Sequence, residues 1–184
     1  MITRLSGKPA RGRQVAISIR PLRAGDETRL QEFFRSHTPE TIHERYGFSV
    51  TTMSPQRASE LVNVDQNRDC ALGVFSADGE QLHAVGRYCL DANGTAAEIA
   101  FVVRESMRRR GLATTLLRRL IAMARVRGLA RLWAETNLHN AAMLGILRRH
   151  RFTVKVDADT GMAIATLELP SPTVRRSPYD KSSD

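Results

Sequence analysis

The chain has 184 residues, of which 42% are apolar and 26% are charged. These values are ordinary for a globular protein and argue against wholesale disorder, a fibrous repeat or a small scaffold that needs disulfides. The 28 Lys and Arg against 19 Asp and Glu give a net charge of +9, which favours an anionic partner: a nucleic acid, a membrane face or a phosphorylated small molecule.

One domain is expected over residues 16–169. The basic stretch 1–15 before it is expected to be a flexible tail, and the stretch 170–184, rich in Pro, Ser and charge, a disordered one.

The first part of the chain predicts a strand and two helices. Ile17–Pro21 alternates in polarity, and Asp26 is a candidate N-cap for a helix that buries leucine and phenylalanine side chains. Ser54, followed by a proline, predicts the start of a second short helix. The segment between the helices contains Pro39 and Gly47 and is expected to be irregular.

Three antiparallel strands joined by tight turns are predicted next. The pairs Asp78-Gly79 and Asn93-Gly94 are typical of hairpin turns and separate the apolar runs. The strands are expected at 70–75, 81–90 and 96–103.

The pattern changes to a helical period after Gly111. Apolar residues then recur on one side and arginines on the other, which predicts an amphipathic helix that ends near Gly128. A strand over 130–135, a short helix over 140–149 and a final strand pair at 152–156 and 162–169 are expected to follow.

Cys70 and Cys89 lie in apolar runs without a CxxC spacing or a nearby histidine ligand pattern. We therefore expect two buried thiols, a reducing compartment and no metal. No segment approaches the ~18 apolar residues of a membrane span, and the first residues lack the apolar stretch of a signal peptide. A cytoplasmic protein with no membrane partner is expected.

An anion site is predicted where the strand 96–103 leads through a glycine-containing turn into the long helix. Such a turn leaves main-chain N–H groups unpaired at the positive end of the helix dipole. The small residues Gly111 and Ala113 let a pyrophosphate approach the main chain, and the arginines at 108–110 add positive charge.

Two motifs here resemble the GNAT family of N-acetyltransferases. Residues 103–117, which contain the pattern R-x-x-G-x-A, resemble the family's acetyl-CoA-binding motif, and residues 140–152 resemble its later helix-and-strand motif. The resemblance covers roughly residues 17–169. It implies an α/β fold of the mixed α+β kind: a central, mostly antiparallel twisted sheet flanked by helices, with a parallel fourth and fifth strand that splay apart.

The resemblance also implies that acetyl-CoA is the acyl donor and lies between the splayed strands. Main-chain groups of Phe101, Val102 and Val103 would bind the pantetheine arm. The pyrophosphate would be held by Arg108, Arg109, Arg110, Gly111, Leu112, Ala113 and Thr114. The remaining residues expected in the donor site are Asn137, Asn140 and Met143.

Glu98 is the candidate general base, because an amine must lose a proton before it attacks the thioester. Its apolar neighbours are expected to desolvate the carboxylate and make it a better base. The alternative is a strand-end glutamate that reaches solvent or pairs with Arg87 on the neighbouring strand. Leu147 replaces the tyrosine that many family members use as general acid, and Arg151 replaces a glycine, which predicts an arginine at positive φ.

The stretch 97–103 looks most like the bacterial protein lysine acetyltransferases, so the leading hypothesis is acetylation of a protein lysine. Acetylation of a small amine and a non-catalytic acyl-CoA-sensing module are the alternatives. A nucleic-acid partner is not expected, because no aromatic residues interleave with the arginines of the long helix. Both a monomer and a homodimer remain open.

Overall fold

The computed structural model describes residues 2–3, 16–46, 52–66 and 68–170. They form an eight-stranded sheet in the order β1-β2-β3-β4-β5-β6-β8-β7. Neighbouring strands are antiparallel except β5 and β6, which are parallel. The strands are β1 (Ile2–Thr3), β2 (Ile17–Pro21), β3 (Cys70–Ser76), β4 (Leu82–Leu90), β5 (Ala96–Val103), β6 (Arg131–Asn137), β7 (Thr153–Asp157) and β8 (Met162–Glu168). The helices are α1 (Glu27–Arg35), α2 (Pro39–Tyr46), α3 (Pro55–Val62), the short 3₁₀ helix η1 (Glu105–Met107), α4 (Leu112–Val126) and α5 (Ala141–Arg149).

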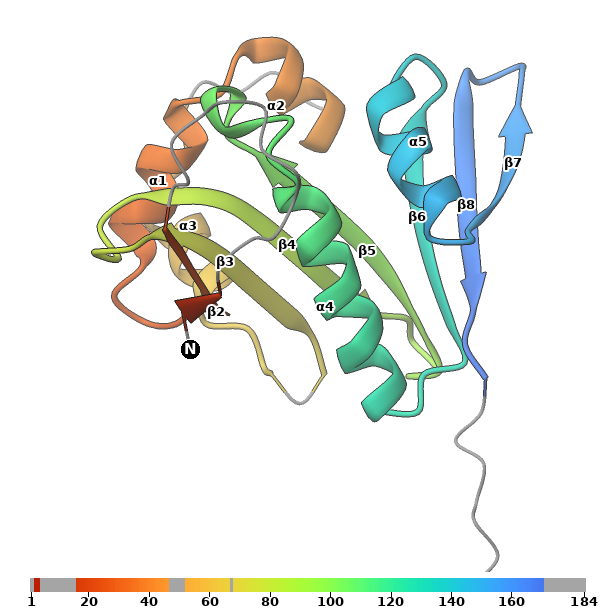
Figure 1. Cartoon of the computed structure of the whole chain (residues 1–184), viewed down its shortest axis with the longest axis horizontal. Coiled ribbons are helices and arrows are strands. Elements are labelled where there is room, and N and C mark those ends of the chain that lie inside the picture. The colour runs from red at the N-terminus through yellow and green to blue at the C-terminus, as the bar shows by residue number, and fades with distance from the viewer. Residues whose placement is uncertain (1, 4–15, 47–51, 67, 171–184) are drawn as a thin grey trace, which may run out of the picture.

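Helices cover both faces of the sheet (Figure 1). α4 and α5 bury side chains such as Leu116 and Leu147 in one core with Ile99 of β5. α1 and α3 pack on the other face, where Phe33 contributes to a second core together with Val102 of β5. Strand β5 therefore contributes to both cores, with Ile99 on one face and Val102 on the other, which fits its largely apolar sequence. Within the described residues, no helix has the length and apolarity to cross a bilayer.

The predicted fold class is confirmed, including the parallel strand pair within a mostly antiparallel sheet. Both hairpin turns are confirmed, with Gly79 and Gly94 at positive φ. β1 adds a strand inside the stretch expected to be a tail, where Ile2 and Thr3 pair with β2. The rest of that stretch, and all of the C-terminal tail after Pro170, lie outside the described residues.

The expectation of an irregular segment around Pro39 is wrong, because residues 39–46 form α2. The Thr38 hydroxyl accepts a hydrogen bond from the backbone N–H of Thr41 at 3.4 Å. Pro39 fits the first turn of a helix because proline lacks a backbone N–H, and N–H groups in this turn have no acceptor within the helix. Gly47 lies outside the described residues.

The two cysteines differ in burial. Cys70 is buried, its Sγ lies 3.7 Å from Met123 Sδ, and burial raises the pKa of its thiol to about 11. Cys89 is exposed, so the expectation of two core thiols is wrong for this residue. An apolar run does not reveal which face of the sheet a strand residue occupies, and Cys89 lies near the C-terminal end of β4, opposite the exposed Glu98.

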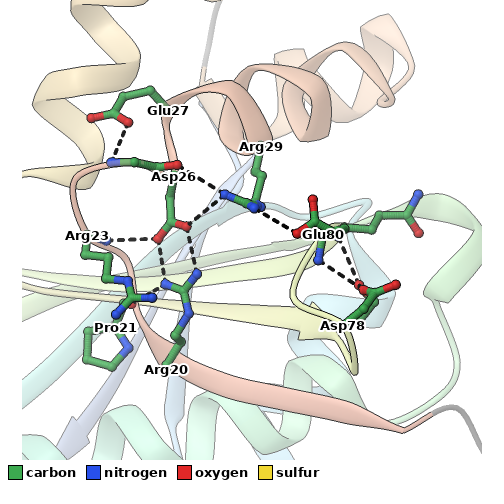
Figure 2. A network of polar contacts seen from close by, with 11 residues as sticks. Arg20, Pro21, Arg23, Asp26, Glu27, Arg29, Asp78 and Glu80 are labelled. Atoms are coloured by element: carbon green, nitrogen blue, oxygen red, sulfur yellow. Dashed lines mark hydrogen bonds and ion pairs between the residues drawn. The ribbon is translucent and has the colours of Figure 1, made fainter.

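Asp26 precedes α1 as predicted, but its side chain makes no capping hydrogen bond. Its carboxylate accepts bonds from Arg20 at 2.6 and 2.7 Å and from the backbone N–H of Arg23 at 3.1 Å. Figure 2 shows Arg29 reaching from α1 toward both Asp26 and Glu80 of the β3–β4 turn. This network joins β2, α1 and the hairpin around an aspartate that is only 1% exposed.

Replacing Asp26 by asparagine is expected to lower the free energy of unfolding by about 3 kcal/mol, because Arg20 loses its carboxylate partner. Burial acts to raise the pKa of Asp26, but hydrogen bonds from Arg20 and Arg23 outweigh it, so the pKa lies below its usual 3.8. This stabilisation is therefore present above the unfolded pKa and is lost as the pH falls through the native value. Urea unfolding at about pH 7, repeated at decreasing pH, should show the two proteins converging in acid.

The control is Glu60→Gln, which breaks an ion pair with Arg57 whose side chains are 61% and 50% exposed. This change should cost less than about 1 kcal/mol. Equal urea midpoints for the wild type and the Asp26 variant would contradict a stabilising role for the network.

Candidate functional site

β5 and β6 pair only over their first residues, which are Ala96 with Arg131, Ala97 with Leu132 and Glu98 with Trp133. Beyond Glu98 the two strands diverge, while β5 continues to pair with β4 and β6 with β8. The diverging edges carry main-chain N–H and C=O groups that no longer bond to each other. A ligand that lies between the strands can therefore hydrogen-bond to the sheet.

The turn between β5 and α4 presents further main-chain donors. Gly111 occupies the N-cap of α4 with a φ of 80°, so no side chain caps this helix. Arg109 is also left-handed, with a φ of 62°. The first N–H groups of a helix, here those of Leu112, Ala113 and Thr114, have no partner within the helix and lie at the positive end of its dipole. The turn is therefore a main-chain anion site.

Helix α5 forms the facing wall. Asn140 caps it through a side-chain oxygen that accepts from the backbone N–H of Met143 at 3.1 Å. This bond occupies the oxygen of Asn140 and leaves its amide NH₂ group as a donor. Met143 and Ile146 are partly buried, and the exposed Arg149 adds positive charge near the end of the helix.

These elements enclose one cleft of about 660 Å³, a size typical of small-molecule sites. Most predicted site residues border it: Glu98, Phe101, Val102, Val103, Arg108, Arg109, Gly111, Leu112, Ala113, Thr114, Asn140 and Met143. The structure thus brings together two sequence motifs that lie some thirty to forty residues apart in the chain.

Arg110 and Asn137 are not part of the cleft lining. Both side chains are exposed. The side-chain oxygen of Asn137 accepts from the backbone N–H of His139 at 2.8 Å, so it orders the turn before α5 instead.

Glu98 lies where β5 and β6 begin to separate and borders the cleft. The expectation that its apolar neighbours enclose it is wrong, because its side chain is exposed. Side chains alternate along a strand, so the buried Ala97 and Ile99 face the core beneath α4 while Glu98 projects from the opposite face. Cys89 lies directly opposite Glu98 on β4, and Arg87 lies opposite Ala100.

The two departures from the family pattern are confirmed as structural features. Leu147 is fully buried in the core, so this position offers no proton donor to the cleft. Arg151 has a φ of 66°, the left-handed conformation that favours the usual glycine.

The sequence interpretation missed four cleft residues that carry polar groups, namely Thr41, Glu135, Thr136 and Arg149. Thr41 comes from α2, which was not predicted. Glu135 follows Trp133 by two residues on β6, so it projects from the same sheet face as Glu98. That alternation could have identified Glu135 from the sequence. Within the described part of the chain, no group of three or more His, Cys, Asp or Glu residues could hold a metal ion.

Comparisons with known proteins agree with this geometry. A family model described as the acetyltransferase (GNAT) family matches residues 30–152. An acetyltransferase of Pseudomonas aeruginosa is 28% identical over 145 residues, which cover 78% of each protein.

Two solved structures show the same fold. The GNAT domain of S. lividans PAT superposes with a TM-score of 0.77 at 25% identity, covering 85% of this chain and 92% of that domain. RimL, a ribosomal L7/L12 alpha-N-protein acetyltransferase in complex with coenzyme A, has a TM-score of 0.69 at 15% identity. The match covers 83% of this chain and 94% of RimL.

Proposed function

Because the chain belongs to the GNAT family of acetyltransferases, whose members take the acetyl group from acetyl-CoA, we propose that it acetylates the ε-amino group of a protein lysine with Glu98 as general base. The observation that carries the proposal is the position of Glu98. Its exposed carboxylate borders the same cleft as the helix N-terminus that would bind the donor phosphates.

The donor half of the proposal rests on main-chain geometry. The diverging edges of β5 and β6 offer hydrogen bonds to the amides of the pantetheine arm. The uncapped end of α4, with Arg108 and Arg109 beside it, offers donors and positive charge to the pyrophosphate.

The acceptor half rests on charge and on an open sheet face. A lysine ammonium is a cation, and the carboxylates of Glu98 and Glu135, which border the cleft from the two diverging strands, would attract it. Glu135 lies opposite Ile164 of β8, and Ile164 lies opposite Lys155 of β7. All three side chains are exposed on this face of the sheet. Such a surface suits a folded acceptor better than an enclosed pocket would. The protein acetyltransferase similarity of the 97–103 stretch points the same way.

The chemistry is a direct transfer. Glu98 takes one proton from the ammonium group, directly or through water, and the free amine then attacks the thioester carbonyl carbon. A carbon–nitrogen bond forms, the carbon–sulfur bond breaks, and coenzyme A leaves as a thiolate. The nitrogen loses a second proton as the amide forms, and with Leu147 buried, water in the open cleft accepts that proton and passes it to the thiolate.

Intact-mass measurement of candidate acceptors tests the proposal. We expect the protein with acetyl-CoA to add one or more acetyl groups to a protein acceptor, and the same acceptor with its lysines reductively methylated beforehand to gain none. Acetylation of small amines without any protein acceptor being modified would contradict the acceptor class. If no amine caused release of coenzyme A from acetyl-CoA, the proposed N-acetyltransferase activity itself would be contradicted.

A further inference from the structure

A polar cluster joins the end of α1 and the start of α2 to the turn that precedes α4, the anion site described above. Its centre is Glu105 of η1, whose carboxylate lies 3.0 Å from His37 Nδ1. The same carboxylate accepts from the backbone N–H of Thr38 and from Arg108 Nη2, each at 3.3 Å. Arg108 Nη2 also donates to the Thr41 hydroxyl at 2.7 Å. Of these five residues, which we call the Glu105 cluster, only Thr41 and Arg108 border the cleft.

The ionisation of the cluster fixes which atoms donate. Burial acts to raise the pKa of Glu105, but hydrogen bonds, including those from Thr41 and from the backbone N–H of Thr38, outweigh it, so the pKa lies below its usual value. Burial lowers the pKa of His37 against the attraction of Glu105, and Arg104 and Arg108 lower it further. A carboxylate only accepts hydrogen bonds, so Nδ1 of a neutral His37 carries the hydrogen.

His37 is itself held in place. Its side chain is 1% exposed, and its ring packs edge-on against Phe33 at 4.5 Å between centroids. Phe33 belongs to the core beneath α1. The core therefore restricts the orientation of the His37 ring, and the ring in turn restricts the orientation of the Glu105 carboxylate.

The Glu105 cluster restricts the side chain of Arg108 through bonds to Glu105 and Thr41. This side chain is 47% exposed, and a long exposed side chain loses much rotamer freedom when it binds a ligand. Bonds to Glu105 and Thr41 restrict the guanidinium before the ligand arrives, which reduces that loss.

We propose that Glu105, oriented by His37, is a positioning residue for donor binding that holds the Arg108 guanidinium beside Thr41, ready to meet the pyrophosphate. The inference rests on the proposed function in one respect, that acetyl-CoA is the ligand of the cleft. It assigns a role to residues outside the cleft lining and makes α2 part of the support for the donor site.

The sign of one measurement separates positioning from simple electrostatics. Glu105 is an anion near a site for anions, so its field alone opposes the pyrophosphate. If only this field mattered, Glu105→Gln would bind acetyl-CoA more tightly than the wild type. If positioning dominates, the same variant binds more weakly.

We expect Glu105→Gln to weaken acetyl-CoA binding about tenfold in titration calorimetry, since a charge-assisted hydrogen bond to Arg108 is lost. S-acetylpantetheine, which lacks the pyrophosphate, should bind both proteins equally. The control Glu168→Gln removes the same charge from an exposed position on β8, outside the Glu105 cluster and the cleft lining, and should not weaken binding. In turnover, the KM for acetyl-CoA should rise while kcat at saturation stays within about twofold.

The His37 variants test the orienting step. His37→Asn can place an amide N–H near the position of Nδ1 and should bind acetyl-CoA within about threefold of the wild type. His37→Leu should weaken binding by about as much as Glu105→Gln, and the double variant should be no weaker than either one. Melting temperatures show that each variant is folded.

Equal or tighter acetyl-CoA binding by Glu105→Gln would overturn the proposal, as would an equal loss for S-acetylpantetheine. A wild type that binds no acetyl-CoA would instead contradict the proposed function, so the two failures are distinguishable.

Discussion

Replacing Gly111 by aspartate is expected to weaken acetyl-CoA binding by about a hundredfold, whereas replacing it by asparagine should weaken binding only a few-fold. Gly111 is the N-cap of α4 and has a φ of 80°. A Cβ built there would have no heavy atom within 4 Å, so the substitution is sterically free on that side. Aspartate and asparagine tolerate the left-handed conformation better than other residues do. The two variants therefore share their backbone cost and shape and differ in one negative charge.

That charge would lie where the donor pyrophosphate is proposed to bind. An acidic residue at a helix N-terminus also stabilises the helix, so the aspartate variant should melt no lower than the asparagine variant. Lost binding with an intact fold would then be an effect on the anion site. Titration calorimetry with acetyl-CoA measures the affinity, and S-acetylpantetheine serves as the ligand without phosphates. Equal affinities of the two variants for acetyl-CoA would contradict a phosphate site at this turn.

Most of the fold was predictable because its signals are local. Strand alternation, the two Gly-containing hairpin turns and the helical period after Gly111 each depend on a few neighbouring residues. The error at α2 was one of interpretation, since Thr38-Pro39-Glu40 carries the same cap-and-proline signature that correctly predicted the helix starting at Pro55. Both sites place a hydroxyl residue directly before the proline.

The site was predictable to the extent that it lies within contiguous motifs. Residues 98–103 and 108–114 are adjacent in sequence and in space, so one pattern identifies both. The sequence left the exposure of Glu98 open between two alternatives, because it depends on where β5 and β6 diverge, and that is set by how β6 pairs with β8. The contact of Thr41 with Arg108 joins residues 67 positions apart, and no local pattern identifies such a contact.

The exposure of Glu98 changes how it would act as a base. An exposed carboxylate would act through its position beside an amine that the cleft has already oriented. Glu135 on the other diverging strand would then share in attracting the cation. Closure of the cleft by the bound donor and acceptor would remove water from both carboxylates and increase their effect.

Replacing Glu98 by glutamine is expected to lower kcat about a thousandfold at neutral pH and to change the KM for acetyl-CoA little, because the variant lacks the proposed general base and keeps the turn before α4 intact. The deficit should shrink as the pH approaches the ordinary lysine pKa of about 10.4, where the free amine forms without a base. Rates at saturating acetyl-CoA over a range of pH measure this. Glu168→Gln is the control and should retain wild-type rates, because this side chain is exposed on β8 and lies outside the cleft lining. A deficit that stays constant with pH would mean that Glu98 acts by placing the substrate, and a larger loss in Glu135→Gln would assign the base to β6 instead.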